Sequence, residues 1–448
     1  MPIFEKITRA IDRAAAFVWG PPMLILLVAT HLFLTVRTGF VQRRIFHAIR
    51  LSVKKSGGNG EVSPLSALAT SLAATIGTGN IIGVAASISL GGAGAVFWCW
   101  LTGIFAMATK YGETFLAIVF RVRTPTGLVG GPMYTIERGL GAPRLAKAYA
   151  LFCALAALAI GAATQSNSMV SAIAEEFFAP GNPASGTPRL ALIVTAAATA
   201  LVAGLIIIGG LKKIGAVCTL LVPLMAVFYA GGCFAVLFLN RAFLLPALRQ
   251  IVVSALNPRA IGGGFAGGAF IAAMRYGVSR GLFSNESGLG SAAITAASAK
   301  TDSPGRQALI TMTATFWDTV VVCALTGLCL VSEIARNPDA AAYTDGARLT
   351  FAAFSRLGTL GPKVLTAALA AFAFSTIIGW YINGERASEY LNRKSVPAYR
   401  LIYIAAVFLG GILPVSAVWG IADCLNGAMA VPNIASLVLL SGVLAKKA

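Results

Sequence analysis

Long apolar runs restrict this chain more than any other feature of its sequence. A helix that crosses a bilayer needs roughly 20 mainly apolar residues, and runs of about that length or longer recur along all 448 residues. Only 11% of the residues are charged, against about 25% in soluble domains. The runs are continuous, whereas strands of a membrane β-barrel alternate apolar and polar residues. The sequence therefore predicts an all-α polytopic membrane protein.

We count eleven such segments, and we expect about eleven transmembrane helices. They are Ala14–Val36, Pro64–Gly91, Ala93–Phe120, Leu145–Ala174, Leu190–Gly209, Ile214–Leu239, Ala260–Ala297, Ala308–Val331, Val364–Ile382, Leu401–Ala417 and Ile421–Leu444.

The formal net charge is +19. In a soluble protein this excess would suggest nucleic-acid binding. In a membrane protein it indicates basic loops kept on the cytoplasmic side. If the loop after the first segment lies inside, 21 Lys and Arg residues fall in inside loops and 11 in outside loops. We therefore expect a multi-pass protein of the cell inner (plasma) membrane, with the N-terminus outside, the C-terminus cytoplasmic, the lipid bilayer as partner and no nucleic acid.

Two segments are rich in glycine at points where a continuous helix is costly. The second holds Thr75, Gly77, Thr78, Gly79 and Asn80 near its middle, and the seventh holds five glycines within residues 262–268. Each glycine costs about 1 kcal/mol in a helix interior. Small residues also let membrane helices pack closely, but glycines beside short polar side chains in two segments favour broken helices.

The two glycine-rich segments occupy corresponding places in the chain. Each opens a set of five segments, and an odd number per set makes the second set run inverted. Two interrupted helices at corresponding positions of inverted halves indicate a secondary transporter. We predict an N-terminal transmembrane helix and basic cytoplasmic loop over 1–62, a first five-helix repeat over 63–240 and an inverted repeat over 241–448.

A broken helix exposes free N–H groups at one half-helix and free carbonyls at the other. The N–H end attracts an anion such as a carboxylate, and the carbonyl end suits a hard cation or an ammonium group. The segment from Thr75 to Asn80 contains no ionisable residue. A neutral, zwitterionic amino acid fits such a break better than a dianion or a sugar does.

An ordered set of motifs, from about Ser63 to the end, resembles the alanine or glycine:cation symporters, the sodium:alanine symporter family. The motifs are Ala74–Asn80, Gly130–Tyr134, Arg275–Glu286 with Gly288, Phe374–Trp380 with Gly384–Arg386, Asp423, Asn426–Gly427 and Val431–Asn433. The resemblance implies a five-plus-five inverted-repeat (LeuT-type) fold with one extra N-terminal helix and two broken helices. It also implies sodium-driven import of small neutral amino acids, typically alanine or glycine, with Na⁺ as coupling ion.

Within that family resemblance, we assign a substrate site to both breaks. Thr78 and Gly79 are candidates for the substrate carboxylate, and Gly263, Gly264 and Phe265 for carbonyls that face the ammonium group. Two further residues are candidates for the substrate site, and for each a second role remains open. Gln165 either contacts the substrate or bonds to a neighbouring helix, and Trp380 either caps a small cavity or lies in an interfacial aromatic belt.

The candidate sodium ligands are oxygens of the first break and of the ninth segment. Carbonyls of Ala73 and Ile76 facing the hydroxyls of Ser375 and Thr376 would form an all-oxygen cation site. These residues match the second sodium site of the broader fold. The alternative is that both hydroxyls bond back onto their own helix.

Asn80 and Asp318 are the remaining candidate sodium ligands. Asn80 either ligates a cation or bonds between helices. An ionisable residue in mid-membrane is by default a candidate functional residue. Asp318 either ligates sodium, carries a proton or is an acid that only makes structural hydrogen bonds.

We expect other charged residues to act at an inner gate or to reach the headgroups. These residues are Lys110, Glu113, Arg275, Arg280 and Glu286.

Three other functions remain as alternatives. A proton-coupled amino acid transporter would use Asp318 or Glu113. A channel usually repeats one pore motif by symmetric assembly, and the sequence shows no such filter. An enzyme is least expected, because the chain has no His–Glu metal motif or Ser–His pairing and both histidines, His31 and His47, lie near the N-terminus. We expect no protein partner.

Overall fold

The structure is a computed structural model that describes residues 2–54, 57–125, 127–178, 188–256, 264–343, 346–413 and 416–447. These residues are almost all helical, and one two-stranded antiparallel hairpin joins β1 to β2. The elements of the first half are α1 (Pro2–Val18), α2 (Pro21–Arg37), η1 (Val41–Arg44), α3 (Ile45–Ser52), α4 (Pro64–Thr75), η2 (Thr78–Asn80), α5 (Ile82–Gly91), α6 (Gly94–Val119), β1 (Val122–Thr124), β2 (Gly127–Val129), α7 (Pro132–Leu140), α8 (Pro143–Ala156), η3 (Ala157–Thr164), α9 (Gln165–Phe178), α10 (Arg189–Ile207), α11 (Gly210–Leu239), η5 (Arg241–Phe243) and α12 (Leu244–Leu256).

The second half is helical throughout its described residues. Its elements are α14 (Gly264–Asn285), α15 (Ser291–Ala296), α16 (Pro304–Thr315), η6 (Phe316–Cys323), α17 (Ala324–Arg336), η7 (Pro338–Ala342), α18 (Gly346–Phe354), η8 (Ser355–Leu357), α19 (Leu360–Leu391), η9 (Arg393–Ser395), α20 (Val396–Ile412), α21 (Ser416–Leu439) and α22 (Ser441–Lys447).

Each of the eleven segments predicted from the sequence is mostly helical over its described residues. Among the described residues, eight helices are long and apolar enough to cross a membrane, or nine if the bent pair formed by Pro64–Thr75 and Thr78–Gly91 is one span. The two predicted segments left over are occupied by α6 and α14, of 26 and 22 residues. Both are long enough to span but more polar: α6 carries the buried Lys110 and Glu113, and α14 carries Arg275 and Arg280.

Two of the long spans contain a stretch of π-helix at their centre. The segment η3 joins α8 to α9 within the 36-residue span Pro143–Phe178, and η6 joins α16 to α17 within the 33-residue span Pro304–Arg336. A π-helical turn widens the helix locally and is frequent at functional sites. Here η6 contains Asp318, and η3 ends directly before Gln165; both are residues of the predicted site.

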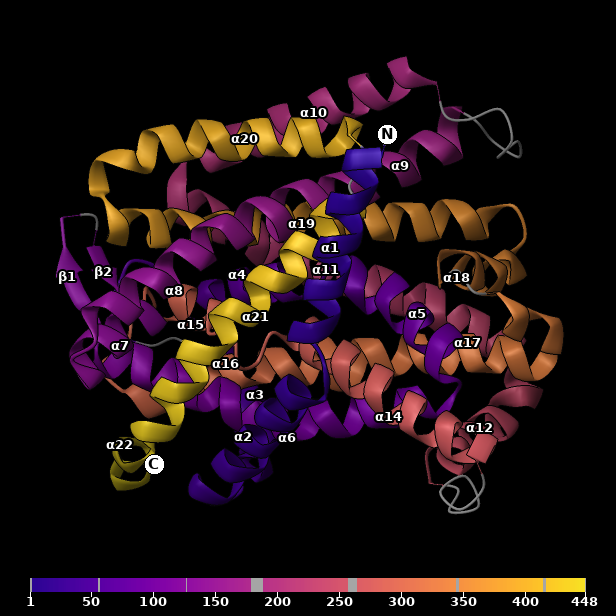
Figure 1. The fold of residues 1–448 in the computed structure, drawn as a ribbon, viewed down its shortest axis with the longest axis horizontal. Coiled ribbons are helices and arrows are strands. Elements are labelled where there is room, and N and C mark those ends of the chain that lie inside the picture. Colours follow the sequence, from indigo (N-terminus) through magenta and orange to yellow (C-terminus); the bar gives the residue numbers. More distant parts are fainter. Residues whose placement is uncertain are drawn as a thin grey trace.

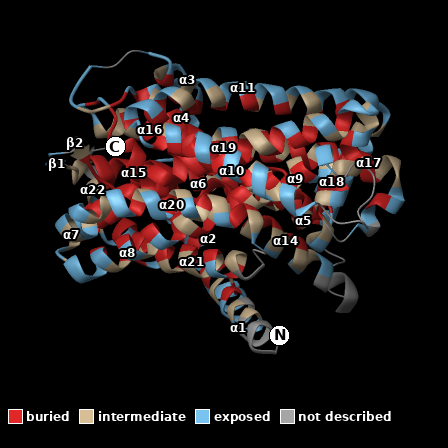
Figure 2. Ribbon diagram, turned by 90° about the horizontal axis from the view of Figure 1, so that it is seen from above, coloured by how far each residue is buried: buried red, intermediate tan, exposed pale blue. Residues whose placement is uncertain are grey.

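The most buried span is α19, which runs through the middle of the molecule (Figure 1). Buried residues concentrate along it and along α4, α6 and α15, while α10, α11 and α20 present exposed faces (Figure 2). Many of the exposed residues on these outer helices are large and apolar, such as Leu201, Leu220 and Leu401. Such an outer surface fits contact with lipid rather than with water.

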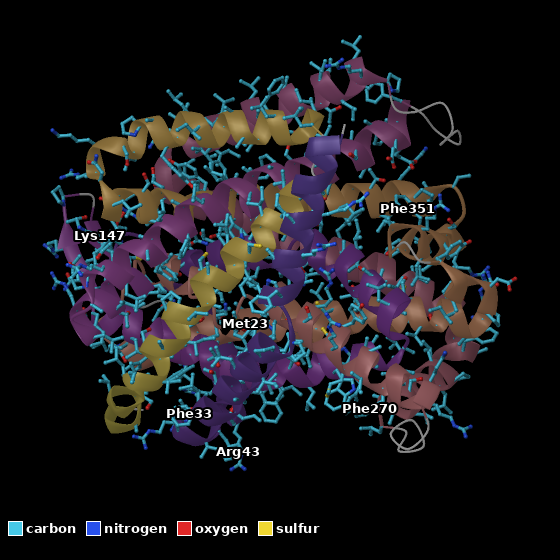
Figure 3. All side chains as sticks on the ribbon, viewed as in Figure 1. Met23, Phe33, Arg43, Lys147, Phe270 and Phe351 are labelled. Atoms are coloured by element: carbon cyan, nitrogen blue, oxygen red, sulfur yellow. The ribbon has the colours of Figure 1, made fainter. Side chains whose placement is uncertain are left out.

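The bundle has two ends, which can be followed in Figure 3 through Lys147 and Phe351. The hairpin end carries β1, β2 and α7, near Lys147, and the α18 end carries α17 and α18, near Phe351 (Figure 1). The short helices α7 and α18 cover these ends and do not match any segment predicted to span. In Figure 2, α1 projects from the body of the bundle.

Candidate functional site

The predicted break in the second span is confirmed. Helix α4 ends at Thr75, and its direction differs from that of the following η2–α5 helix by 64°. Between them the Gly77 N–H donates to the Asn80 side-chain oxygen at 2.9 Å, which holds the turn. Gly77 lies so close to Thr376 Oγ1 that a Cβ at this position would be 2.7 Å away. Glycine therefore lets the break approach α19.

The four residues predicted for an all-oxygen cation site lie together. The Ser375 hydroxyl is 3.5 Å from the Ala73 carbonyl oxygen and 3.4 Å from that of Ile76, and the Thr376 hydroxyl is 3.2 Å from the Ile76 oxygen. Both hydroxyls also lie within hydrogen-bond distance of the Phe372 carbonyl on their own helix, at 2.8 and 3.0 Å. Back-bonding to Phe372 uses the hydroxyl proton and leaves oxygen lone pairs facing the break.

The close approach of α19 to α4 depends on a glycine one turn beyond the hydroxyl pair. A Cβ on Gly379 would lie 2.6 Å from the Ala74 backbone nitrogen. Any larger residue at this position would push the two helices apart.

A second polar cluster surrounds Asp318, which is completely buried. Its Oδ1 accepts from the Asn80 amide at 2.6 Å, and its Oδ2 from the Thr319 and Ser284 hydroxyls at 2.6 and 2.9 Å. The Asn80 amide also donates to the Ser284 hydroxyl at 2.9 Å. The cluster thus joins the first break to α14 and η6. Sequence reasoning missed Ser284 as a site residue, although it lies within the motif Arg275–Glu286.

Gln165 also reaches the first break. The Thr78 hydroxyl donates to the Gln165 side-chain oxygen at 3.2 Å. Its neighbour Asn167 points elsewhere and donates to the Gly410 and Leu413 carbonyls of the tenth span, at 3.1 and 3.2 Å. Gln165 therefore lies beside the break, while Asn167 ties two helices together.

The predicted location of the second break is wrong. Gly264 and Phe265 begin the continuous helix α14, and Gly263 lies outside the described residues. Helices rise about 1.5 Å per residue, so Gly264 is about 30 Å along α14 from its last residue, Asn285. Glycines at the start of a helix need not break it, and Gly264, Gly267 and Gly268 lie within α14.

The seventh span is instead interrupted over Glu286–Gly290, between α14 and α15. Glu286, Gly288 and Gly290 all have positive φ angles, of 53°, 104° and 79°. L-residues other than glycine rarely adopt such a conformation, so Glu286 is held there by its surroundings. We name residues 286–290 the second break.

Trp380 contacts this second break. Its ring nitrogen donates to one Glu286 carboxylate oxygen at 2.9 Å, and the Ser291 hydroxyl donates to the other at 2.5 Å. Trp380 is completely buried within the chain. It packs against Gly161 of η3, where a Cβ would lie 2.3 Å from the Trp380 Cβ. Trp380 is therefore a residue of the protein interior and not of an aromatic belt.

Arg275 and Arg280 lie in the C-terminal half of α14, which leads into the second break. They line a cavity of about 290 Å³ together with Trp19, Trp419 and Asp423. The other three charged residues expected at a gate, Lys110, Glu113 and Glu286, do not line this cavity. Lys110 and Glu113 do form a buried pair, with Nζ and Oε2 3.9 Å apart.

A short ladder ties the two broken spans together at the hairpin end. Residues 59–62, directly before α4, pair with residues 298–302, after α15, through a parallel bridge between Val62 and Ala299. The Lys300 N–H donates to the Val62 oxygen at 2.8 Å and the Glu61 N–H to the Ser298 oxygen at 2.8 Å. We name this pairing the hairpin-end ladder.

Two arginines support the hairpin-end ladder. Arg121 follows α6 and donates to the carbonyls of Ala299 and Thr301 in the ladder and to that of Ala297 directly before it. Arg386 of α19 pairs with Glu61 at 3.2 Å. Burial raises the pKa of the Glu61 carboxyl above its ordinary value, and the Arg386 guanidinium opposes that shift. As the pH falls, the Glu61 carboxyl would therefore be protonated, and its ion pair with Arg386 weakened, at a higher pH than in a fully solvated ion pair.

Known proteins resemble the chain over nearly its whole length. The family model described as "Sodium:alanine symporter family" matches residues 4–448. The sodium/alanine symporter AgcS of Methanococcus maripaludis is 45% identical over 445 residues, covering 97% of this chain and 94% of that protein. The probable sodium/glutamine symporter GlnT of Bacillus subtilis is 34% identical over 435 residues, covering 95% and 86%. The crystal structure of MhsT in complex with L-phenylalanine aligns with a TM-score of 0.54 at 16% identity, covering 87% of this chain and 100% of that one.

The fold and its two interrupted helices define a membrane transporter of the LeuT-type, five-plus-five inverted-repeat class. This confirms the fold class predicted from the sequence. The chain belongs to the sodium:alanine symporter family, as its motifs indicated. It is therefore a multi-pass membrane transporter and not an enzyme.

Proposed function

We propose that the chain is a sodium-coupled symporter that imports small neutral amino acids, alanine and glycine first among them, by alternating access. The hairpin end, with the basic residues of β1, α7 and α8, faces the cytoplasm in this proposal, since basic loops are retained inside. The N-terminus is then outside and the C-terminus cytoplasmic. We also retain the proposed division into a helix and loop over 1–62 and inverted repeats over 63–240 and 241–448.

The observation that carries the proposal is the spacing of the oxygens from Ala73, Ile76, Ser375 and Thr376. Hard cations about the size of calcium bind oxygen at about 2.3–2.6 Å, so adjacent ligands in octahedral geometry lie about 3.3–3.7 Å apart. Two of the hydroxyl-to-carbonyl distances, 3.4 and 3.5 Å, fall within that range, and the third, 3.2 Å, lies just below it. Sodium is a cation of this size, and uncharged oxygens suit a monovalent ion.

Asp318 and Asn80 support a second sodium position in the same proposal. Asp318 is a fully buried carboxylate joined to Asn80, Ser284 and Thr319. A buried charge is stabilised by pairing with an opposite charge, and a sodium ion among these oxygens would provide it.

The substrate would lie between the first break and Trp380. Thr78 and Gly79 are the proposed partners of its carboxylate, and the Gln165 amide, already bonded to Thr78, is a third. AgcS is described as a sodium/alanine symporter and GlnT as a probable sodium/glutamine symporter, so both relatives support a neutral amino acid. Buried Trp380, packed against Gly161, favours a small side chain.

A proton-coupled amino acid transporter is the second candidate. The single observation that favours it is Asp318, because a buried carboxylate surrounded by hydrogen-bond donors can alternate between ionised and neutral forms. The two candidates differ in which cation gradient drives uptake.

The test is alanine uptake into liposomes that contain the purified protein. We expect uptake with an inward sodium gradient and none when choline or potassium replaces sodium. Uptake driven equally by a proton gradient without sodium would favour the second candidate. Competition by a panel of unlabelled amino acids would then rank alanine, glycine, serine and glutamine.

A further inference from the structure

A carboxylate from the third span is bound directly to the second break. Glu113 Oε1 of α6 accepts the Gly288 N–H at 2.7 Å and the Gly290 N–H at 3.0 Å. It also accepts from the Asn433 amide of α21 at 2.8 Å, and that amide donates to the Gly288 carbonyl at 2.8 Å. One oxygen therefore joins α6, α21 and the second break.

These hydrogen bonds replace the backbone hydrogen bonds that the helix lost where it unwinds. Backbone N–H groups buried in a membrane protein must find an acceptor inside the protein. Glu286, Gly288 and Gly290 all have positive φ, a shape that no regular helix would maintain. A charged acceptor makes stronger hydrogen bonds than a neutral one, so Glu113 is suited to holding this shape.

Lys110 supplies the counter-charge. It lies one turn before Glu113 on α6, is completely buried, and its Nζ is 3.9 Å from Glu113 Oε2. Neither of these two atoms has a hydrogen-bond partner among the described residues. The pair is therefore held by charge, and Glu113 Oε1 remains available for the backbone.

The second break connects Glu113 to Trp380. Glu286 is two residues before Gly288, and its carboxylate bonds to the Trp380 ring nitrogen. A shift of the 286–290 backbone would therefore move the Glu286 carboxylate and the Trp380 ring together.

We propose that Glu113, charge-paired with Lys110, is a positioning residue for the substrate site: it holds the second break in the conformation that places Glu286 against Trp380. The inference rests on the proposed function, because it takes Trp380 as part of the substrate site. It assigns Glu113 to the substrate site and not to an inner gate.

Two neutral double variants separate the hydrogen bonds from the ion pair. E113Q/K110M keeps an acceptor oxygen at position 113, and E113M/K110M has a side chain of the same length with no such oxygen. We expect the alanine KM of E113M/K110M to rise about tenfold or more, the size of losing hydrogen bonds to a charged acceptor. The KM of E113Q/K110M should rise less, because the two N–H groups keep an acceptor, although an uncharged and weaker one.

Hydrogen–deuterium exchange of the peptide around residues 283–293, without substrate, gives a readout that does not depend on transport. We expect faster exchange in E113M/K110M than in E113Q/K110M. Equal KM values and equal exchange for the two variants would overturn the inference. If the unmodified protein takes up no alanine, the proposed function fails, and the exchange comparison still decides the role of Glu113.

Glu113→Asp covers the case in which the double variants do not fold. It keeps the negative charge opposite Lys110 but is shorter by one methylene group, so the carboxylate no longer reaches both N–H groups. We expect a raised KM with the maximal rate largely retained. An unchanged KM in a well-folded Glu113→Asp protein would count against the inference.

Discussion

Thr376→Ala tests the proposed cation site most directly. The Thr376 hydroxyl oxygen lies 3.2 Å from the Ile76 carbonyl oxygen across the gap between α19 and the first break. The substitution removes that oxygen and leaves the helix backbone unchanged. It also removes the bond to Phe372, which is local to α19 and makes a small contribution.

The magnitude follows from the number of oxygens. The site offers two carbonyls and two hydroxyls, and Thr376→Ala removes one of the four. Interactions of a polar group with a charge contribute about 1.5–3 kcal/mol. Each 1.4 kcal/mol is a factor of ten in affinity, so we expect the sodium concentration for half-maximal uptake to rise about 10- to 100-fold.

The assay is alanine uptake into proteoliposomes over a range of sodium concentrations. Thr366→Ala is the matched control, because it makes the same change on the same helix. Thr366 is ten residues away, or about 15 Å along α19, and its buried hydroxyl has no hydrogen-bond partner among the described residues. Its sodium dependence should match that of the unmodified protein.

The result that would refute the reasoning is a Thr376→Ala protein that transports alanine with an unchanged sodium dependence. A loss of transport with a lowered melting temperature would instead indicate misfolding. Thr376→Ser then serves as the second variant, because it restores the oxygen and should restore the sodium dependence.

Three further predictions address other parts of the site. Asp318→Asn keeps hydrogen-bond acceptor capacity but removes the charge, so we expect half-maximal sodium to rise at least about tenfold; a lost pH dependence with unchanged sodium dependence would favour proton coupling instead. Gly379→Ala places a Cβ against the backbone of α4 and should cost about 1–3 kcal/mol, seen as a lower melting temperature, whereas Gly231→Ala, with open space around it, should not. Arg121→Leu removes the donors that hold the hairpin-end ladder, so the ladder amides should exchange faster with deuterium, while Arg123→Leu on the exposed face of β1 should leave them unchanged.

The first break was predictable because its signal is local. Glycines and short polar side chains from Thr75 to Asn80 interrupt an apolar run, and in a bilayer such a sequence needs a cavity or partners. The hydroxyl pair Ser375–Thr376 was also predictable as a partner, but only through the family resemblance. Its distances to Ala73 and Ile76 come from the packing of α19 on α4.

The second break was misplaced because its signal is not local. The glycines of residues 262–268 look more like an interruption than Glu286–Gly290 does, yet Gly264 onwards is helical. The unwound Gly288 and Gly290 N–H groups find their acceptor in Glu113, which also bonds to Asn433, and both partners are far away in sequence. Glycine counts cannot reveal acceptors supplied by other helices. Ser284 was missed for the same reason.

By itself, the sequence determined that this chain is a polytopic membrane protein, how many apolar segments it has, where one of them breaks, and to which family it belongs. These properties follow from hydropathy, local helix cost and ordered motifs, all of which are read along the chain. Only the tertiary structure decided where the second break lies, how closely the hydroxyls approach their carbonyls, and that Glu113 accepts hydrogen bonds from the backbone of that break. The physical reason is that a buried polar group needs a partner inside the protein, and in this fold the partners come from helices hundreds of residues apart.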